Sequence, residues 1–230
     1  MRLTPFLISL TAFAFTAQTA HAQSTKIPTE QTSKSEPVPA GTFTEIEGDH
    51  VIGNTDAPVT MIVYASVTCP HCSHWFETVW PKLNKDYVDK GELRIVFREF
   101  PTAPAQLAIA GFQIANCAPE EKYFSLIEHQ MAEQENIIEG VKAGNGLETY
   151  LAIAKLAGLE DKEQMDTCLE SEAGIERMQA AMELASAAKV TGVPAFIIDG
   201  KLYKGNGEFA PLKQHLDKVI ARGFTPVPKR

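Results

Sequence analysis

Two cysteines separated by two residues, Cys69 and Cys72, are the side chains of this 230-residue chain best suited to chemistry. The residues between them are Pro70 and His71. A Cys-x-x-Cys pair can close a disulfide and open it again, so it can exchange electrons with other thiols. A loop this short hardly restricts the unfolded chain, so the spacing predicts a redox-active pair rather than a structural crosslink.

The pair lies where a predicted strand passes into a predicted helix. Residues 60–64 are mostly β-branched or aromatic, which is typical of a strand buried on both faces. Apolar residues after Cys72 recur at helical spacing, as at Phe76 and Leu83. A helix N-terminus offers free backbone N–H groups and the positive end of the helix dipole. We therefore predict a lowered pKa for Cys69, with Cys72 shielded inside the first turn.

The first 22 residues contain the three parts of a secretory signal in order. Arg2 is basic, residues 3–17 are largely apolar, and Ala20-His21-Ala22 fits a cleavage site. A membrane anchor is the alternative, but this apolar run is short and contains polar residues. We predict that residues 1–22 are a signal peptide cleaved after Ala22, so the protein is exported.

Residues 23–42 are polar, contain three prolines and have no hydrophobic period. This composition predicts a disordered linker. The linker also lacks heptads, so it offers no means of oligomerisation through a coiled coil, and we expect a monomer.

Two further cysteines, Cys117 and Cys168, bring the number to four. An even number in an exported protein favours pairing, so we expect a structural disulfide between them. The alternative is two unpaired thiols buried in helices.

The overall charge argues against several classes of partner. The chain has 21 basic and 29 acidic residues and a formal net charge of −8. Without a basic run, binding to nucleic acid or to an anionic membrane surface is not expected. Cys69 and Cys72 with His71 and His74 are an alternative metal site, but zinc sites usually take ligands from a second cluster, which is missing here. We predict no metal and no cofactor.

The remaining pattern predicts strands before and after a long helical block. Asp199-Gly200 between two apolar runs predicts a β-hairpin. Predicted strands are 43–46, 60–64, 93–100, 195–198 and 201–203, and predicted helices are 105–117, 120–134, 147–157, 161–168, 175–189 and one from about Pro211 to Gly223, with a loop at 135–146. This order predicts an α/β fold, a thioredoxin-like mixed sheet with a large all-helical insertion. Residues 43–101 and 190–223 would form the thioredoxin-like domain, and 102–189 the inserted domain.

The sequence Cys69-Pro70-His71-Cys72, the helical insertion and Gly192-Val193-Pro194 before a hairpin together resemble the DsbA family of periplasmic thiol–disulfide oxidoreductases. The resemblance extends from about residue 43 to residue 223. It implies that Cys69 is the attacked cysteine and Cys72 its buried partner, while Pro70 and His71 tune the pair. It also implies that Pro194 is a cis-proline that binds substrate together with Val193.

The resemblance further implies a periplasmic oxidase that introduces disulfides into exported proteins and is reoxidised by a membrane partner like DsbB. An isomerase or reductase that acts in the reduced form is one alternative. A binding or chaperone-like module is another, although the presence of both Cys69 and Cys72 counts against it. Arg98 and Glu99, near a strand end, are interpreted as a solvated edge with no role as a proton acceptor.

Overall fold

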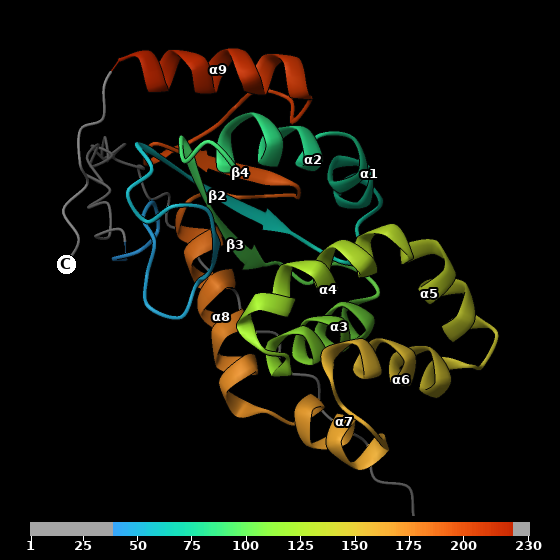
Figure 1. Ribbon diagram of the computed structural model, residues 1–230. Coiled ribbons are helices and arrows are strands. Elements are labelled where there is room, and N and C mark those ends of the chain that lie inside the picture. Colours follow the sequence, from blue (N-terminus) through green and yellow to red (C-terminus); the bar gives the residue numbers. More distant parts are fainter. Residues whose placement is uncertain (1–38, 223–230) are drawn as a thin grey trace, which may run out of the picture. The chain divides into compact units, whose positions relative to one another are not determined.

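The computed structural model describes residues 39–222 of the chain and contains a five-stranded mixed sheet. The strand order is β1-β3-β2-β4-β5, with β2 and β3 parallel and the other pairs antiparallel. The strands are β1 (His50–Ile52), β2 (Val59–Ala65), β3 (Leu93–Glu99), β4 (Ala195–Ile198) and β5 (Lys201–Leu202). This arrangement confirms the predicted thioredoxin-like mixed sheet, and Figure 1 shows β2 and β3 side by side at its centre.

Both faces of the central strand β2 are buried, as its apolar sequence predicts. Met61, Val63 and Ala65 face the larger hydrophobic core, together with residues of α1 (Pro70–Thr78), α2 (Trp80–Leu83) and α9 (Phe209–Ala221). Ile62 and Tyr64 face a smaller core beside the end of α8 (Glu172–Ala187). The sheet is therefore covered by helices on both faces.

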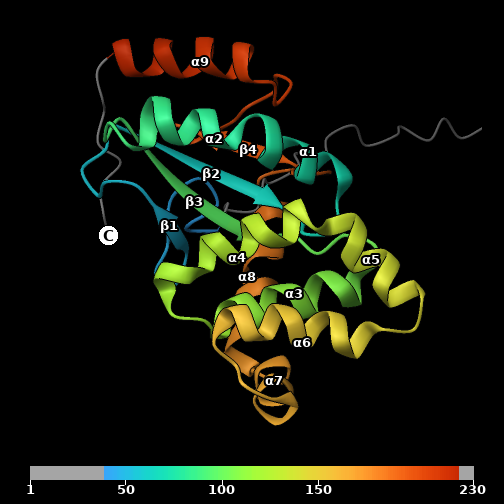
Figure 2. The same cartoon turned by 45° about the vertical axis from the view of Figure 1, so that its right-hand side comes forward.

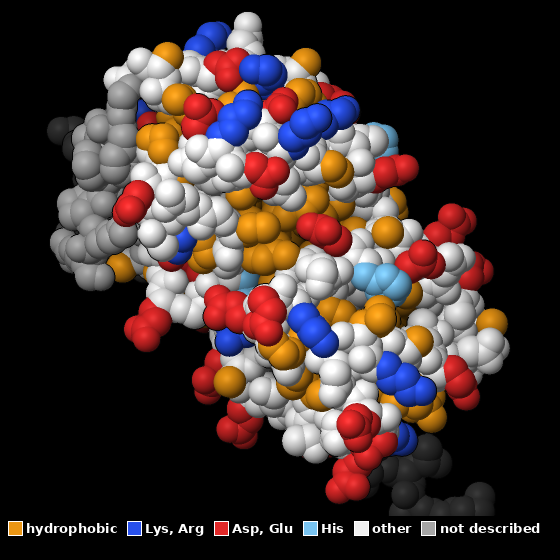
Figure 3. All heavy atoms as spheres, in the orientation of Figure 1, with side chains coloured by type: hydrophobic (Ala, Val, Ile, Leu, Met, Phe, Trp, Pro, Cys, Tyr) orange, Lys and Arg blue, Asp and Glu red, His pale blue; other side chains and the backbone are white. Residues whose placement is uncertain are grey.

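Six helices lie between β3 and β4 in the chain, so the predicted all-helical insertion is present. They are α3 (Ala105–Cys117), α4 (Glu120–Ala132), α5 (Gln134–Lys142), α6 (Gly146–Ala157), α7 (Lys162–Leu169) and α8. Figure 2 shows α3, α4 and α5 gathered near the arrowheads of β2 and β3. In Figure 3 hydrophobic side chains gather on the face between α2 and α4. Trp80 of α2, which is buried, stacks on Phe124 of α4. Within residues 39–222, no helix combines the length and the hydropathy needed to cross a membrane.

Local sequence signals placed several element ends correctly. Asp161 caps α7 through a hydrogen bond from the Gln164 amide, and Gly158 ends α6 with a φ of 95°. Asp199 and Gly200 have φ values of 49° and 71°, as a type I′ hairpin requires. The helix after Cys72 is interrupted at Val79, and a π-helical turn (Asn84–Val88) follows α2.

The predicted first strand at 43–46 is wrong, because these residues form a bend and the edge strand is β1. The predicted linker also extends too far, since residues 39–42 form a turn in which Thr42 Oγ1 donates to Pro39 O. The Arg98 guanidinium donates to Gly41 O and Thr44 O, so a side chain from β3 provides hydrogen bonds to two backbone carbonyls between residues 41 and 44. The predicted signal peptide 1–22 and Gly223 lie outside the described residues.

The predicted loop at 135–146 is also wrong, because most of it forms α5. Ile137 and Val141, one turn apart, pack against the core. Gly140 permits a close approach to α6, since a Cβ on this residue would lie 2.6 Å from Thr149 Oγ1. The glycine therefore serves helix packing and does not break the helix.

Arg98 and Glu99 are buried rather than solvated, which corrects the interpretation made from the sequence. Each is only 2% exposed. Arg98 pairs with Asp49 at 2.8 Å and also donates to Tyr64 Oη. Glu99 Oε1 accepts hydrogen bonds from Asn116 Nδ2 and from the Tyr123 hydroxyl, both in the insertion. The two side chains therefore tie β3 to the segments that cover it.

Replacing Glu99 with glutamine is expected to stabilise the folded protein above neutral pH. Burial raises the pKa of Glu99 to about 7, although the hydrogen bonds from Tyr123 and Asn116 oppose this rise. An unperturbed glutamate has a pKa of about 4.3. Between these pH values the folded protein retains the proton and the unfolded chain releases it, so stability falls by up to about 1.4 kcal/mol per pH unit.

Urea denaturation at pH 5 and pH 8 tests this expectation. The gain of Glu99→Gln over the wild type should be about 2–3 kcal/mol larger at pH 8 than at pH 5, because glutamine keeps the carbonyl acceptor and never ionises. Glu121→Gln, at an exposed position of α4, is the control and should change little at either pH. An equal effect of Glu99→Gln at both pH values would contradict protonation of Glu99 in the folded protein.

Candidate active site

Cys69 is the N-cap residue of α1, and Pro70 occupies the first helical position. Proline is favoured there because its missing N–H has no partner in the first turn and its φ suits a helix. The Cys69 carbonyl accepts hydrogen bonds from the amides of Cys72 at 2.9 Å and Ser73 at 3.1 Å. The residues that follow the strand therefore close directly into a helix and bring the two cysteines together.

The two thiols are free and differ in their surroundings. Cys72 is completely buried, whereas Cys69 is 8% exposed. A hydrogen bond from the Cys72 side chain, followed by those from the backbone amides of Cys72 and His71, lowers the pKa of Cys69 to about 5 against the effect of burial. The interaction with Cys69, together with burial, strongly raises the pKa of Cys72. At neutral pH the site therefore holds a Cys69 thiolate beside a Cys72 thiol.

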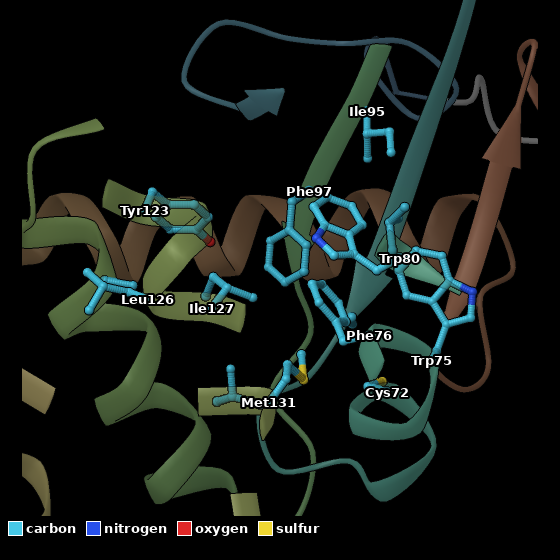
Figure 4. Close-up of a cluster of buried hydrophobic side chains, with 14 of the residues drawn as sticks. Cys72, Trp75, Phe76, Trp80, Ile95, Phe97, Tyr123, Leu126, Ile127 and Met131 are labelled. Atoms are coloured by element: carbon cyan, nitrogen blue, oxygen red, sulfur yellow. The ribbon is translucent and has the colours of Figure 1, made fainter. Parts of the chain in front are cut away.

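An aromatic cluster holds α1 against the sheet and the insertion. Trp75, Phe76 and Trp80 form contacts with one another, and Phe76 and Tyr123 both meet Phe97 of β3 at centroid distances of 6.1 Å. Figure 4 shows these rings together, with Cys72 at the edge of the cluster. Because large buried rings resist displacement, the cluster fixes the helix that carries the cysteines.

The second predicted feature, Val193-Pro194, lies against Cys69. The peptide bond between these residues is cis. The Cys69 sulfur is 3.4 Å from Val193 O, to which it donates a hydrogen bond in the thiol form. Residues 124 positions apart in the chain thus meet at one sulfur atom.

A surface groove of about 560 Å³ extends from this meeting point. It is lined by His71, His74 and Trp75 of α1, by residues 189–196 and by residues 202–208. Trp75 Nε1 donates to Gly207 O at 3.0 Å and so anchors the far wall. A Cβ at Gly207 would lie 2.9 Å from the Phe196 ring, so glycine allows this wall to approach closely. The groove can accept an extended polypeptide segment beside Cys69.

Among residues 39–222, no cluster of three or more histidine, cysteine or acidic side chains could hold a metal ion. His71 and His74 both line the groove instead. Cys117 at the end of α3 and Cys168 in α7 form a disulfide with a Cα–Cα distance of 6.0 Å. The four cysteines therefore divide into a free pair at the start of α1 and a bridge within the insertion.

Two contacts to the active-site loop had no signal in the sequence. The Ser66 amide donates to Cys72 Sγ at 3.4 Å. Gln134, from the start of α5, donates to the carbonyls of Val67 and Cys69. Neither a serine in a strand-to-helix loop nor a glutamine in a polar segment stands out by type or spacing.

Removing the Cys72 thiol is expected to raise the pKa of Cys69 more than removing the His71 imidazole does. Cys72 contributes the largest stabilising hydrogen bond, whereas the side chain of His71 contributes the smallest named one. We expect Cys72→Ala to raise the pKa of Cys69 by about one unit or more, and His71→Ser to raise it by less. Thiolate absorbance against pH measures both.

His74→Ser is the control, because His74 lines the groove but is not among the groups that lower the pKa of Cys69. It should leave the titration unchanged. A larger effect of His71→Ser than of Cys72→Ala would reverse the proposed order of contributions.

Comparison with known proteins agrees with this geometry. A family model described as thioredoxin matches residues 45–218. A Rickettsia felis protein whose name places it among protein-disulfide oxidoreductases is 28% identical over 180 residues, which are 78% of this chain and 63% of that protein. This chain spans less than two thirds of the length of that relative and of those from Rickettsia typhi and Rickettsia prowazekii.

Solved structures share the fold. Wolbachia pipientis alpha-DsbA1 superposes with a TM-score of 0.68 at 23% identity, over 77% of this chain and 94% of that one. A protein-disulfide isomerase from Novosphingobium aromaticivorans has a TM-score of 0.61 at 26% identity, over 75% of this chain and 97% of that one. Because the family match covers most of the described chain, the protein belongs to the thioredoxin family and has the fold of its DsbA-like members.

Proposed function

We propose that this protein is a thiol–disulfide oxidoreductase that introduces disulfides into exported proteins through Cys69 and Cys72. The observation that carries the proposal is the Cys69 thiol, whose pKa is lowered to about 5, at the end of a groove beside Val193 O. A thiolate that is stable at neutral pH is both a reactive nucleophile and a good leaving group.

In the oxidised protein a substrate thiolate attacks Cys69 Sγ and breaks the Cys69–Cys72 bond, which leaves Cys72 to take up a proton. A second substrate thiol loses its proton and attacks the substrate sulfur of the mixed disulfide. Cys69 then departs as a thiolate. The substrate loses two electrons and the cysteine pair gains them, so the reaction needs no cofactor.

The direction of the reaction follows from the stability of the reduced pair. A disulfide is a strong oxidant when its dithiol form is stabilised. Hydrogen bonds from Cys72 and from the amides of Cys72 and His71 stabilise the Cys69 thiolate and therefore the reduced protein. Pro70 places the helix start, and His71 adds a smaller contribution.

Val193 and Pro194 are the proposed substrate-binding residues. The cis peptide and the Val193 carbonyl lie beside Cys69, where an extended chain that brings its sulfur to Cys69 must pass. Backbone groups can pair with such a chain whatever its side chains, which suits a protein that acts on many substrates.

The cellular setting remains part of the proposal. Residues 1–22 have the composition of a signal peptide, so we place the mature protein in the periplasm as a monomer. An oxidase must recover its disulfide after every turnover. We therefore propose a membrane partner like DsbB as the reoxidant.

A disulfide isomerase that acts in the reduced form is the second candidate, because the Novosphingobium aromaticivorans structure is named for that activity. An isomerase uses the same Cys69 thiolate to attack wrongly formed substrate disulfides. A non-catalytic binding module is less well supported, since the chain keeps both Cys69 and Cys72 as free thiols at the start of α1.

Equilibration of the purified protein with glutathione mixtures tests the direction. We expect a potential clearly more oxidising than that of thioredoxin, about −270 mV. The rate at which the oxidised protein oxidises a reduced, unfolded substrate is the second measurement. A potential near the thioredoxin value, with efficient refolding of a scrambled substrate, would replace the oxidase by the isomerase.

A further inference from the structure

One buried amide connects the helical insertion to the active-site loop. Gln134 Nε2 donates to Val67 O at 2.8 Å and to Cys69 O at 3.2 Å. Gln134 is 6% exposed, and both recipient residues are less than one tenth exposed. The two N–H groups of a single side-chain amide therefore hold carbonyls on both sides of Thr68, just before α1.

A second hydrogen bond joins the same part of the insertion to α1. Ser73 Oγ donates to Met131 O at 2.7 Å. Met131 lies in the last turn of α4, where backbone carbonyls lack partners within the helix, and Gln134 opens the next helix. The junction of α4 and α5 thus contacts the loop before Cys69 and the helix after it.

These contacts bear on the chemistry through the position of Cys69. The backbone amides that stabilise its sulfur belong to His71 and Cys72. The direction in which these N–H groups point depends on the backbone conformation at the start of α1. The Cys69 carbonyl is the first acceptor of that helix and also accepts from Gln134. A loop free to rotate about Val67 and Cys69 would carry the sulfur away from these amides.

We infer that Gln134 is a positioning residue for the Cys69–Cys72 pair, by which the helical insertion holds the active-site loop in the geometry that stabilises the Cys69 thiolate. This inference rests on the proposed redox function. Gln134 does not touch the sulfur or the groove, and it acts through the carbonyls that it binds. The insertion then takes part in setting the redox properties of the pair as well as covering it.

The chain offers a closely matched control. Gln130 is also a buried glutamine, 2% exposed, one turn earlier in α4. Its Nε2 donates to Gly111 O at 3.1 Å, so its hydrogen bond stays within the insertion. Gln130→Met and Gln134→Met therefore remove the same type of group from similar surroundings, and only the second frees the active-site loop.

The test uses the full chain and measures thiolate absorbance against pH together with the glutathione equilibrium. Gln134→Met should raise the pKa of Cys69 by about one unit and shift the equilibrium about tenfold toward the protein disulfide, whereas Gln130→Met should shift it less than about threefold. The shorter side chain of Gln134→Asn should not reach the carbonyls of Val67 and Cys69, so this variant should change the pKa of Cys69 and the glutathione equilibrium in the same direction as Gln134→Met. Gln134→Asn replaces Gln134→Met in the test if the methionine variant folds poorly.

Unchanged titration and equilibrium in both Gln134 variants, or shifts equal to those of Gln130→Met, would overturn the inference and leave Gln134 a purely structural residue. Gln134 variants that lose thermal stability but keep the wild-type titration and equilibrium would likewise show that Gln134 is purely structural. The reduction potential of the wild-type protein tests the proposed function separately. A wild-type potential near that of thioredoxin would refute the oxidase direction. The glutathione equilibrium constants of the Gln134 variants, compared with those of the wild type and Gln130→Met, would still decide the role of Gln134.

Discussion

Cys69→Ala is expected to reduce dithiol oxidation to the uncatalysed rate, a loss on the order of a thousandfold or more. The remaining Cys72 cannot replace it, because this thiol is completely buried and its pKa is strongly raised. Cys72→Ala should also stop turnover, since one cysteine cannot hold an internal disulfide. Its Cys69 should nevertheless remain a reactive thiolate.

Alkylation separates the two variants. At pH 7, iodoacetamide should modify Cys72→Ala on the order of a hundredfold faster than Cys69→Ala, because the rate follows the accessible thiolate. Cys72→Ala should also accumulate a stable mixed disulfide with substrate, which mass spectrometry detects. Equal alkylation rates would contradict the assignment of Cys69 as the attacked residue.

Removal of the Cys117–Cys168 bridge is expected to destabilise the protein by about 4 kcal/mol, because this crosslink closes a loop across a separation of 51 residues. The bridge joins α3 to α7, so its loss lets the unfolded chain explore many more conformations. The double variant Cys117→Ala/Cys168→Ala should therefore unfold at a clearly lower urea concentration. Its Cys69 titration should remain that of the wild type.

The control removes the other two cysteines. Cys69→Ala/Cys72→Ala opens a loop too short to restrict the unfolded chain, so it should not lower stability comparably. Both double variants are compared with the fully oxidised wild type by urea denaturation. A loss below about 1 kcal/mol for the Cys117 and Cys168 variant would show that the bridge contributes little to the folded state.

Local patterns in the sequence predicted much of the fold and the centre of the site. The strand at 60–64, the helix start at Cys69 and the Asp199-Gly200 turn depend on neighbouring residues, whose propensities act over a few positions. The Cys-x-x-Cys spacing and the helix N-terminus likewise predicted which thiol is acidic. The incorrect elements, at 43–46 and 135–146, are short or rich in glycine, and distant contacts decide their conformation.

The sequence by itself determined the cysteine pair and the mixed sheet with its helical insertion, because residue spacing and short-range periodicity contain this information. Only the tertiary structure decided which distant groups surround the pair. Arg98 and Glu99 are buried because residues 41–49, Asn116 and Tyr123 cover them. Gln134 reaches the Cys69 carbonyl from 65 positions away, and long-range packing of this kind leaves no periodic trace in the chain.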